Sequence, residues 1–409
     1  MKSFIILTLG AALAVILITA GCENDYPASV WDPNFNSKPT PVIDRVEPAF
    51  SFSGIGQVTI TGSNFSSVVE ENTVYFNGKK GKTLSATTTE IVVQAPVLVA
   101  DSATIKVHVM GAFLFGEYKP YQLKEAALIY KAIDNQIEAF AVAVDPDENI
   151  YVIANNQILQ IADPDSPAVV YGTTTFSICD NMRWAPDGAL LLLRGNRFVY
   201  RVEPGGGAAS IWVRFENVND RVSTGDFDQN GNLYVGGRSQ KIFAIAANGD
   251  TTTVFRFPDY RYMAIRVYDG YVYTSATYDG DGTPDISEGI WRHQILDASG
   301  TLGTQELVYD WGSYAGELGP SILSLEFDEN GLMYLGLDID HAIMNLAISG
   351  GTPTPLYPEI LLPPTTNMVW GNATFIYINR HELDPEKVDQ RRIIRLEMPF
   401  KGAPGYGRP

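Results

Sequence analysis

The stretch Thr224-Gly-Asp-Phe-Asp-Gln-Asn-Gly-Asn-Leu-Tyr-Val235 decides the fold, because it ends one strand, turns on Asp, Asn and Gly, and starts another. Asp, Asn and Gly favour tight turns, and the aromatic and branched residues on either side of them favour β-strands. We therefore interpret residues 224–235 as two strands joined by a short turn.

The same unit occurs six times in the chain. Each copy has an aromatic or leucine residue at the equivalent position: Tyr151, Leu191, Tyr234, Tyr273, Tyr334 and Tyr377. Successive members are 40, 43, 39, 61 and 43 residues apart. Four of these five spacings match the roughly 40–45 residues of a four-stranded propeller blade. A second strand-like unit follows each copy, at residues 158–161, 198–202, 242–245, 290–293, 343–346 and 393–396.

This periodicity predicts an all-β chain in which residues 124–400 form a six-bladed β-propeller, followed by a tail at 401–409. One blade cannot bury both of its faces alone, so the blades must stack around an axis. Ala127–Tyr130 precede the first blade, and we expect them to close the ring as the outer strand of the last blade. The pattern D-x-x-G-N-x-Y-V at Asp228–Val235 resembles NHL-type repeats.

Residues 40–123 show a second set of short strands. Val58 and Ile60 alternate with threonines, which is strand periodicity, and Asn77-Gly78 is a hairpin signal. These features favour an immunoglobulin-like sandwich. Taken in order, four segments resemble the IPT/TIG domain: residues 41–48, 54–65, 74–78 and 91–96. The resemblance implies that this domain acts as a spacer.

Residues 1–21 read as a secretory signal peptide with a basic start at Lys2 and an apolar run at Phe4–Ile18. Ile18–Cys22 resembles the lipobox of bacterial lipoproteins, which implies cleavage before Cys22 and lipidation of its sulfur. A lipid chain at Cys22 would anchor the protein to a membrane. Residues 22–39 lack periodicity and read as a tether.

The acidic residues directly after Cys22 suggest where the protein is anchored. Glu23-Asn24-Asp25 resembles the surface-export signal of Bacteroidota lipoproteins. This favours the outer face of the outer membrane, with the periplasmic face as the alternative.

Composition excludes several function classes. The net charge of −18, without a basic block, argues against nucleic acid as a partner. Cys179 has no second cysteine in the mature chain, so we expect a buried apolar residue and no disulfide. The four histidines form no zinc-hydrolase motif, and no G-x-S-x-G sequence is present.

The 61-residue spacing contains a candidate calcium loop. Asp279, Asp281 and Asp285 lie two and four residues apart, among glycines. Closely spaced carboxylates on a curved loop suit Ca²⁺, and the string resembles the calcium loops of thrombospondin type-3-like repeats. The alternative is a solvated Asp/Gly turn.

The innermost strands carry polar residues that we expect to line the mouth of the channel: Asn181, Asp226, Arg266, Glu326 and Asn367. Trp311 and Tyr314 lie in a loop-like segment, and we expect them to face a ligand, since aromatic rings stack on sugars.

These residues favour a non-enzymatic surface lipoprotein whose propeller binds a glycan or a protein. Calcium-dependent lactonases share a six-bladed architecture, so a metal-dependent hydrolase, lactonase or lyase is the alternative. A structural subunit of an outer-membrane complex is a third possibility.

Overall fold

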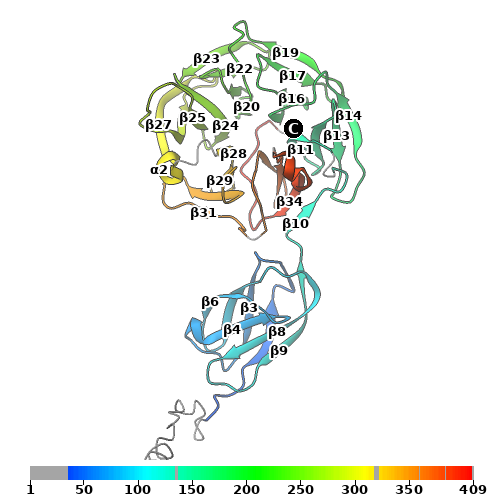
Figure 1. Ribbon diagram of the computed structural model, residues 1–409, viewed down its shortest axis with the longest axis vertical. Helices are drawn as coiled ribbons and strands as arrows, with labels where there is room; N and C mark the ends of the chain where they lie inside the picture. The colour runs from blue at the N-terminus through cyan, green and yellow to red at the C-terminus, as the bar shows by residue number, and fades with distance from the viewer. Residues whose placement is uncertain (1–35, 134–136, 317–321, 359, 383, 408–409) are drawn as a thin grey trace, which may run out of the picture.

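The computed structural model describes residues 36–133, 137–316, 322–358, 360–382 and 384–407. The predicted signal peptide, Cys22 and residues 22–35 of the predicted tether lie outside the described residues. No helix among the described residues is long and apolar enough to span a membrane. The described chain forms a sandwich followed by a ring of blades (Figure 1).

The sandwich consists of two sheets around one apolar core. Val58 and Ile60 are fully buried while Thr59 and Thr61 point the other way, so the alternation in the sequence sets the face that is buried. One sheet has the order β1 (Val42–Glu47), β3 (Gln57–Ser63), β7 (Glu90–Gln94), β6 (Lys82–Ala86). The other has the order β2 (Phe50–Phe52), β9 (Gly116–Lys124), β8 (Ala100–Val109), β4 (Asn72–Phe76), β5 (Lys79–Lys80).

The first three blades are antiparallel sheets whose strands follow chain order from the axis outward. Blade 1 holds β11 (Phe140–Val144), β12 (Ile150–Ala154), β13 (Gln157–Ile161) and β14 (Val169–Thr173), and the short β18 (Gly207–Ala208) pairs with β14. Blade 2 holds β15 (Asn181–Trp184), β16 (Leu190–Leu193), β17 (Phe198–Val202) and β19 (Ser210–Arg214). Blade 3 holds β20 (Thr224–Phe227), β21 (Leu233–Gly236), β22 (Lys241–Ile245) and β23 (Thr251–Arg256).

The last three blades repeat this arrangement. Blade 4 holds β24 (Tyr260–Tyr268), β25 (Tyr271–Tyr278), β26 (Glu288–Ile295) and β27 (Leu302–Asp310). Blade 5 holds β28 (Ile322–Phe327), β29 (Leu332–Leu337), β30 (Ile343–Ala347) and β31 (Thr354–Pro355). Blade 6 holds β32 (Asn367–Trp370), β33 (Phe375–Arg380), β34 (Arg392–Glu397) and β10 (Ala127–Ile129).

The ring closes as predicted, because β10 from the start of the propeller completes the last blade. Ala127, Leu128 and Ile129 pair antiparallel with Leu396, Arg395 and Ile394. The fully buried Tyr130 continues this pairing by donating its backbone N–H to the Ile393 carbonyl at 3.0 Å. The two ends of the propeller chain are therefore held in one sheet.

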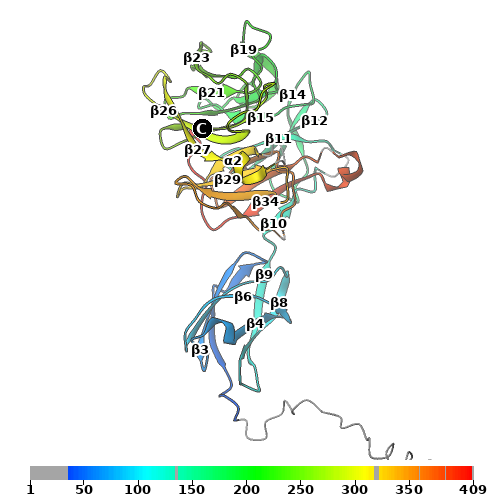
Figure 2. The same ribbon diagram turned by 60° about the vertical axis from the view of Figure 1, so that its left-hand side comes forward.

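The connection between the two domains is very short. Strand β9 of the sandwich ends at Lys124 and β10 begins at Ala127. The Ala126 carbonyl accepts a hydrogen bond from the Glu397 backbone N–H at 2.9 Å, and Ala126 itself is buried. The linker is thus part of the last blade, as Figures 1 and 2 show where the cyan chain enters the ring.

The recurring Asp of the sequence unit organises the turn between the first two strands of a blade. In blade 3, Asp228 Oδ1 accepts hydrogen bonds from the backbone N–H groups of Asn230 and Asn232, both at 2.9 Å. Its Oδ2 accepts the Tyr234 hydroxyl at 3.2 Å. Asp145 and Asp328 bind the Tyr151 and Tyr334 hydroxyls in the same way, at 2.9 and 3.1 Å. The conserved spacing of the repeat therefore has a local physical cause.

Candidate ligand site

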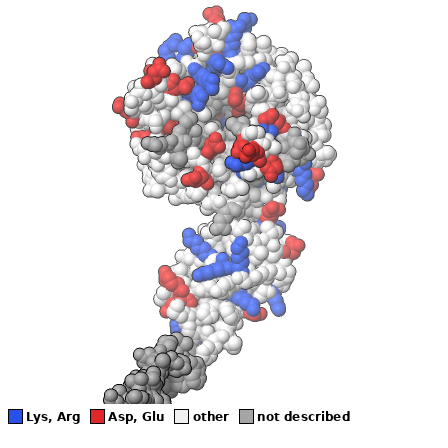
Figure 3. Space-filling model, viewed as in Figure 1, with Lys and Arg blue, Asp and Glu red and all other residues white. Residues whose placement is uncertain are grey.

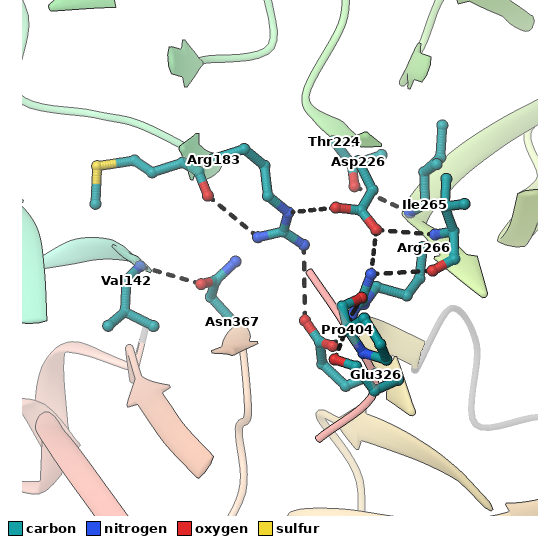
Figure 4. Close-up of polar contacts among 12 residues, drawn as sticks. Val142, Arg183, Thr224, Asp226, Ile265, Arg266, Glu326, Asn367 and Pro404 are labelled. Carbon is teal, nitrogen blue, oxygen red and sulfur yellow. Dashed lines mark hydrogen bonds and ion pairs between the residues drawn. The ribbon is translucent and has the colours of Figure 1, made fainter. Parts of the chain in front are cut away.

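The polar residues of the innermost strands mostly satisfy backbone groups of a neighbouring blade. Each innermost strand has one edge without a partner strand, and buried N–H groups there need acceptors. Asn367 Oδ1 accepts from the Val142 N–H at 3.0 Å, and Thr224 Oγ1 accepts from the Ile265 N–H at 3.0 Å (Figure 4). Asn367 and Thr224 thus link successive blades.

A buried ion-pair network lies across the channel between these strands. Arg266 donates from Nε to Glu326 at 2.7 Å and from a terminal nitrogen to Asp226 (Figure 4). Arg183 approaches the same two carboxylates at 3.4 and 3.8 Å. Burial lowers the pKa of Arg266, but Asp226 and Glu326 outweigh it and raise that pKa overall. The guanidinium therefore stays charged, and both carboxylates are occupied by arginines.

The C-terminal tail covers the channel below this network. Arg266 also donates to the backbone carbonyls of Ala403 and Pro404, at 3.4 and 3.2 Å. The Ala403 N–H donates to the Phe327 carbonyl at 2.9 Å, at the end of β28. Gly405 and Gly407 of the tail line a small hollow with Arg266 and Glu326. No described residue of the tail lies near the first residues of the innermost strands, such as Asn181 and Asn367, at the other mouth. The tail therefore leaves the other mouth of the channel open.

A cavity of about 740 Å³ occupies that open mouth. Its wall combines ends of the innermost strands, such as Asn181 and Asn367, with the loops that follow the second strand of several blades. Phe140, which is partly exposed, adds aromatic surface, whereas Tyr262 is fully buried behind the wall. Because the network and the tail close the channel beneath it, the cavity is a dead-ended hollow and not a pore.

Five arginines line this cavity. Arg183 is held by the network at its floor. The other four we call the arginine cluster; they come from blades 2, 3 and 4 and the loops before them, and are Arg194, Arg221, Arg238 and Arg261. Among the described residues, no carboxylate lies within 4.0 Å of any guanidinium of the cluster. Figure 3 shows basic side chains gathered over the upper half of this face.

Three acidic residues share the cavity wall, and two of them have raised pKa values. Loss of hydration raises the pKa of Asp180 to about 6, although Arg194, Arg238 and Arg221 act in the opposite direction. Burial, followed by repulsion from Glu382, raises the pKa of Asp338. Both carboxyl groups therefore take up a proton at a higher pH than an exposed aspartate would.

Histidine and cysteine at the cavity wall have structural roles. Burial lowers the pKa of His381, whose Nδ1 lies 3.0 Å from the Ala139 carbonyl oxygen. Cys179 is buried as predicted, and burial raises the pKa of its thiol. A neutral imidazole adds no positive charge to the cavity, and a protonated thiol is a poor nucleophile at neutral pH.

The structure divides the five predicted channel residues between two levels. Asn181 and Asn367 line the cavity, while Asp226, Arg266 and Glu326 form the network below it. Asn181 Oδ1 is buried and has no hydrogen-bond partner among the described residues.

The expectation that Trp311 faces a ligand is wrong. The segment forms a short helix, α2 (Trp311–Ala315), and the Trp311 side chain is completely buried in an apolar cluster of blades 4 and 5. Tyr314 is exposed, but it lies outside the cavity lining. The apolar surface of Trp311 is better satisfied inside the blade than in water.

The predicted calcium residues are not gathered into a ligand set. Asp279, Asp281 and Asp285 are all exposed on the loop between β25 and β26. Among the described residues, no group of three or more His, Cys, Asp or Glu side chains is placed to hold a metal ion. Calcium binding here stays a prediction. Calorimetric titration of Ca²⁺ into the wild type and Asp281→Asn tests it, and equal heats would remove the site.

Most of the arginine cluster lies outside the innermost strands, in the loops around them, and was not among the predicted site residues. The residue four positions after the aligned aromatic lines the cavity in three blades, as Arg238, Asp338 and His381. This position lies one or two residues after the end of the second strand, at the open mouth. The repeat alignment therefore held a signal for these residues.

The geometry defines the class of protein: a β-sandwich followed by a six-bladed propeller with a dead-ended polar cavity. Residues 41–122 match the IPT/TIG domain family, so the sandwich is an IPT/TIG domain. No curated protein matches the chain.

Three solved structures resemble the whole arrangement or the propeller. An auxiliary nutrient binding protein from Bacteroides thetaiotaomicron has a TM-score of 0.50 and 13% identity, covering 88% of this chain and 98% of its own. A putative phosphatase from the same organism has a TM-score of 0.50 and 10% identity, covering 89% and 98%. A luciferin-regenerating enzyme has a TM-score of 0.54 and 11% identity, covering 68% and 98%. At these identities the likeness establishes the fold alone.

Proposed function

We propose that this chain is a non-catalytic binding protein of the bacterial cell surface, whose propeller cavity holds a glycan or a protein segment. The IPT/TIG domain serves as the spacer between the membrane anchor at Cys22 and the propeller. The observation that carries the proposal is the hollow of about 740 Å³ at the open mouth of the channel. Ligand sites in proteins typically enclose roughly 300–1,000 Å³.

The cavity suits recognition because polar and aromatic groups meet in it. The unpartnered Oδ1 of Asn181 is an acceptor that a ligand hydroxyl would satisfy. The partly exposed Phe140 supplies apolar area on the same wall. The likeness to an auxiliary nutrient binding protein with the same two-domain arrangement supports a binding role.

The alternative, a metal-dependent hydrolase, lactonase or lyase, needs free carboxylates around the channel. In this chain Asp226 and Glu326 are paired with Arg266 and Arg183. A cation would have to displace both arginines from a buried site, which leaves charges unpaired. The arrangement therefore favours binding over metal catalysis.

A glycan array probed with residues 36–409 tests the proposal. We expect at least one glycan to bind, and we expect Ile178→Asp to weaken that binding at least fivefold in isothermal titration. Ile178 is on the cavity wall and 53% exposed, so the substitution removes apolar contact without disturbing the core. Ile211→Asp is the matched control, since Ile211 is equally exposed on the outer strand β19.

Binding that is unchanged by Ile178→Asp would place the ligand elsewhere and contradict the proposal. Turnover of a bound glycan that is lost with EDTA would favour the enzymatic alternative.

A further inference from the structure

The charge of the cavity departs from the charge of the whole chain. The chain carries 47 acidic and 29 basic residues, which gives a net charge of −18. Apart from Arg183, which the network below neutralises, the cavity wall instead carries the four arginines of the cluster against Asp180, Asp338 and Glu382. A local excess of positive charge in an acidic protein is the arrangement expected for an anionic ligand.

The arginines of the cluster are also poorly satisfied inside the protein. The Nε atoms of Arg194 and Arg261 are buried without a hydrogen-bond partner among the described residues. Arg194 lies over the Phe176 ring, with Cζ at 4.4 Å from the ring centroid, which orients the guanidinium without neutralising it. Arg221 bonds only a backbone carbonyl, that of Gly195, at 3.0 Å. Guanidinium groups held in this way are available to carboxylates or sulfates.

We infer that the cavity binds an anionic saccharide, whose carboxylates or sulfates contact the arginine cluster. This inference rests on the proposed function. The hydroxyl groups of the sugar rings meet neutral acceptors of the wall, such as Asn181, and a ring face meets the partly exposed Phe140. A short saccharide fits a dead-ended hollow, whereas a folded protein would present a convex surface of much larger area.

The arrangement assigns different tasks to the two groups of arginines. Arg266 and Arg183 are neutralised by Asp226 and Glu326 and hold the ring together. The arginine cluster lies above them, and three of its members, Arg194, Arg221 and Arg238, interact electrostatically with Asp180. Anion recognition therefore depends on the cluster and not on the network.

Isothermal titration with three matched probes tests this inference: tetragalacturonate for carboxylates, a chondroitin sulfate tetrasaccharide for sulfates, and maltotetraose as the neutral saccharide. Each is titrated into residues 36–409 at 50 and 300 mM NaCl. We expect a charged probe to bind at least tenfold more tightly than maltotetraose. We expect its affinity to fall at the higher salt concentration, because exposed charges are screened.

Two variants locate the charge. Arg238→Gln together with Arg261→Gln removes two positive charges of the cluster and keeps most of the side-chain volume, and we expect at least a tenfold loss of affinity for the charged probe. Arg238 is exposed and Arg261 partly exposed, so folding should survive, and the melting temperature checks this. Arg256→Gln is the control, since Arg256 is an exposed arginine on β23 of blade 3, outside the cavity.

The outcomes separate this inference from the proposed function. Equal binding of maltotetraose and the charged probes, weakened by Ile178→Asp but not by the double variant, would overturn the anionic ligand and leave the glycan-binding role intact. If a polyglutamate peptide bound as tightly as the charged saccharides, the inference that the ligand is a saccharide would be wrong, and the inference that it is an anion would stand. Failure of every array glycan and every probe would overturn both proposals.

Discussion

At the scale of single residues, one carboxylate per turn explains why the sequence repeats. Asp145, Asp228 and Asp328 each accept bonds from two turn N–H groups and from a tyrosine hydroxyl six residues later. The Asp-to-Tyr spacing in the sequence is therefore the length of this hydrogen-bonded turn. Blade 4 reaches its second strand through the shorter Asp269-Gly270 turn and lacks the motif.

Replacing the turn carboxylate should destabilise the propeller. We expect Asp228→Ala to lower the free energy of unfolding by roughly 2–4 kcal/mol, because it leaves a buried hydroxyl and two N–H groups without their acceptor. Urea unfolding followed by tryptophan fluorescence measures this. Asp250→Ala, in an exposed turn of the same blade, is the control and should change stability by less than about 0.5 kcal/mol.

Asp180 makes the stability of the fold depend on pH. Its pKa of about 6 in the folded state exceeds the ordinary value of 3.8, so ionisation costs the folded state free energy above pH 6. This cost disappears as the pH falls from 6 to below 4. We therefore expect Asp180→Asn to raise the melting temperature at pH 7.5 and to leave it unchanged at pH 3.5. A variant with the same melting temperature as the wild type at pH 7.5 would refute the raised pKa.

At the scale of strands and blades, sequence periodicity predicted the architecture well. The six aligned positions all fall in second strands, and Ala127–Ile129 form the closing strand. The 61-residue spacing is explained by blade 4, whose strands have 9, 8, 8 and 9 residues, and by helix α2. Burial of an apolar face repeats along the chain, so the pattern was visible without coordinates.

The candidate site was harder to predict than the blades. Asn181 and Asn367 were placed at the channel mouth, but partnership between Asp226 and Arg266, 40 residues apart, depends on how blades 3 and 4 pack. Trp311 shows the same limit, because a polar-looking loop in the sequence became a helix that buries its aromatic residue. The amino-acid composition of a short segment does not predict which residues from other blades it will contact.

The closing strand β10 should contribute strongly to stability. Leu128 and Arg395 are opposite each other in the same register as the hydrogen-bonded pair Tyr130 and Ile393, so Leu128→Pro removes a ladder hydrogen bond. We expect the free energy of unfolding to fall by roughly 2 kcal/mol or more. Differential scanning calorimetry measures this change. Ile129→Thr, at an exposed position of the same strand, should lower the free energy of unfolding much less.

At the scale of the whole molecule, the C-terminal tail acts as the base of the channel. It is held by backbone hydrogen bonds from Ala403 to Phe327 and from Glu329 to Lys401, and by Arg266. The wall of the cavity above thus combines residues far apart in sequence, from all six blades, while the tail closes the channel beneath it.

Removing the tail should weaken the ring as a whole. We expect deletion of residues 399–409 to lower the melting temperature by several degrees, because Arg266 loses two acceptors and apolar surface on blades 3 to 5 becomes exposed. Lys401→Ala keeps the backbone bonds of the tail and serves as the control. If the deletion variant and Lys401→Ala had the same melting temperature, the tail would not stabilise the ring.

The pairing of β10 with β34 also constrains how the polypeptide matures. A nascent chain delivers β10 first and β34 last, so about 260 residues must emerge before the first strand finds its mate. Until then an open edge is presented to proteases and to other chains. A polypeptide truncated before residue 392 lacks β34 and cannot close the propeller ring. Such products are natural targets for quality control.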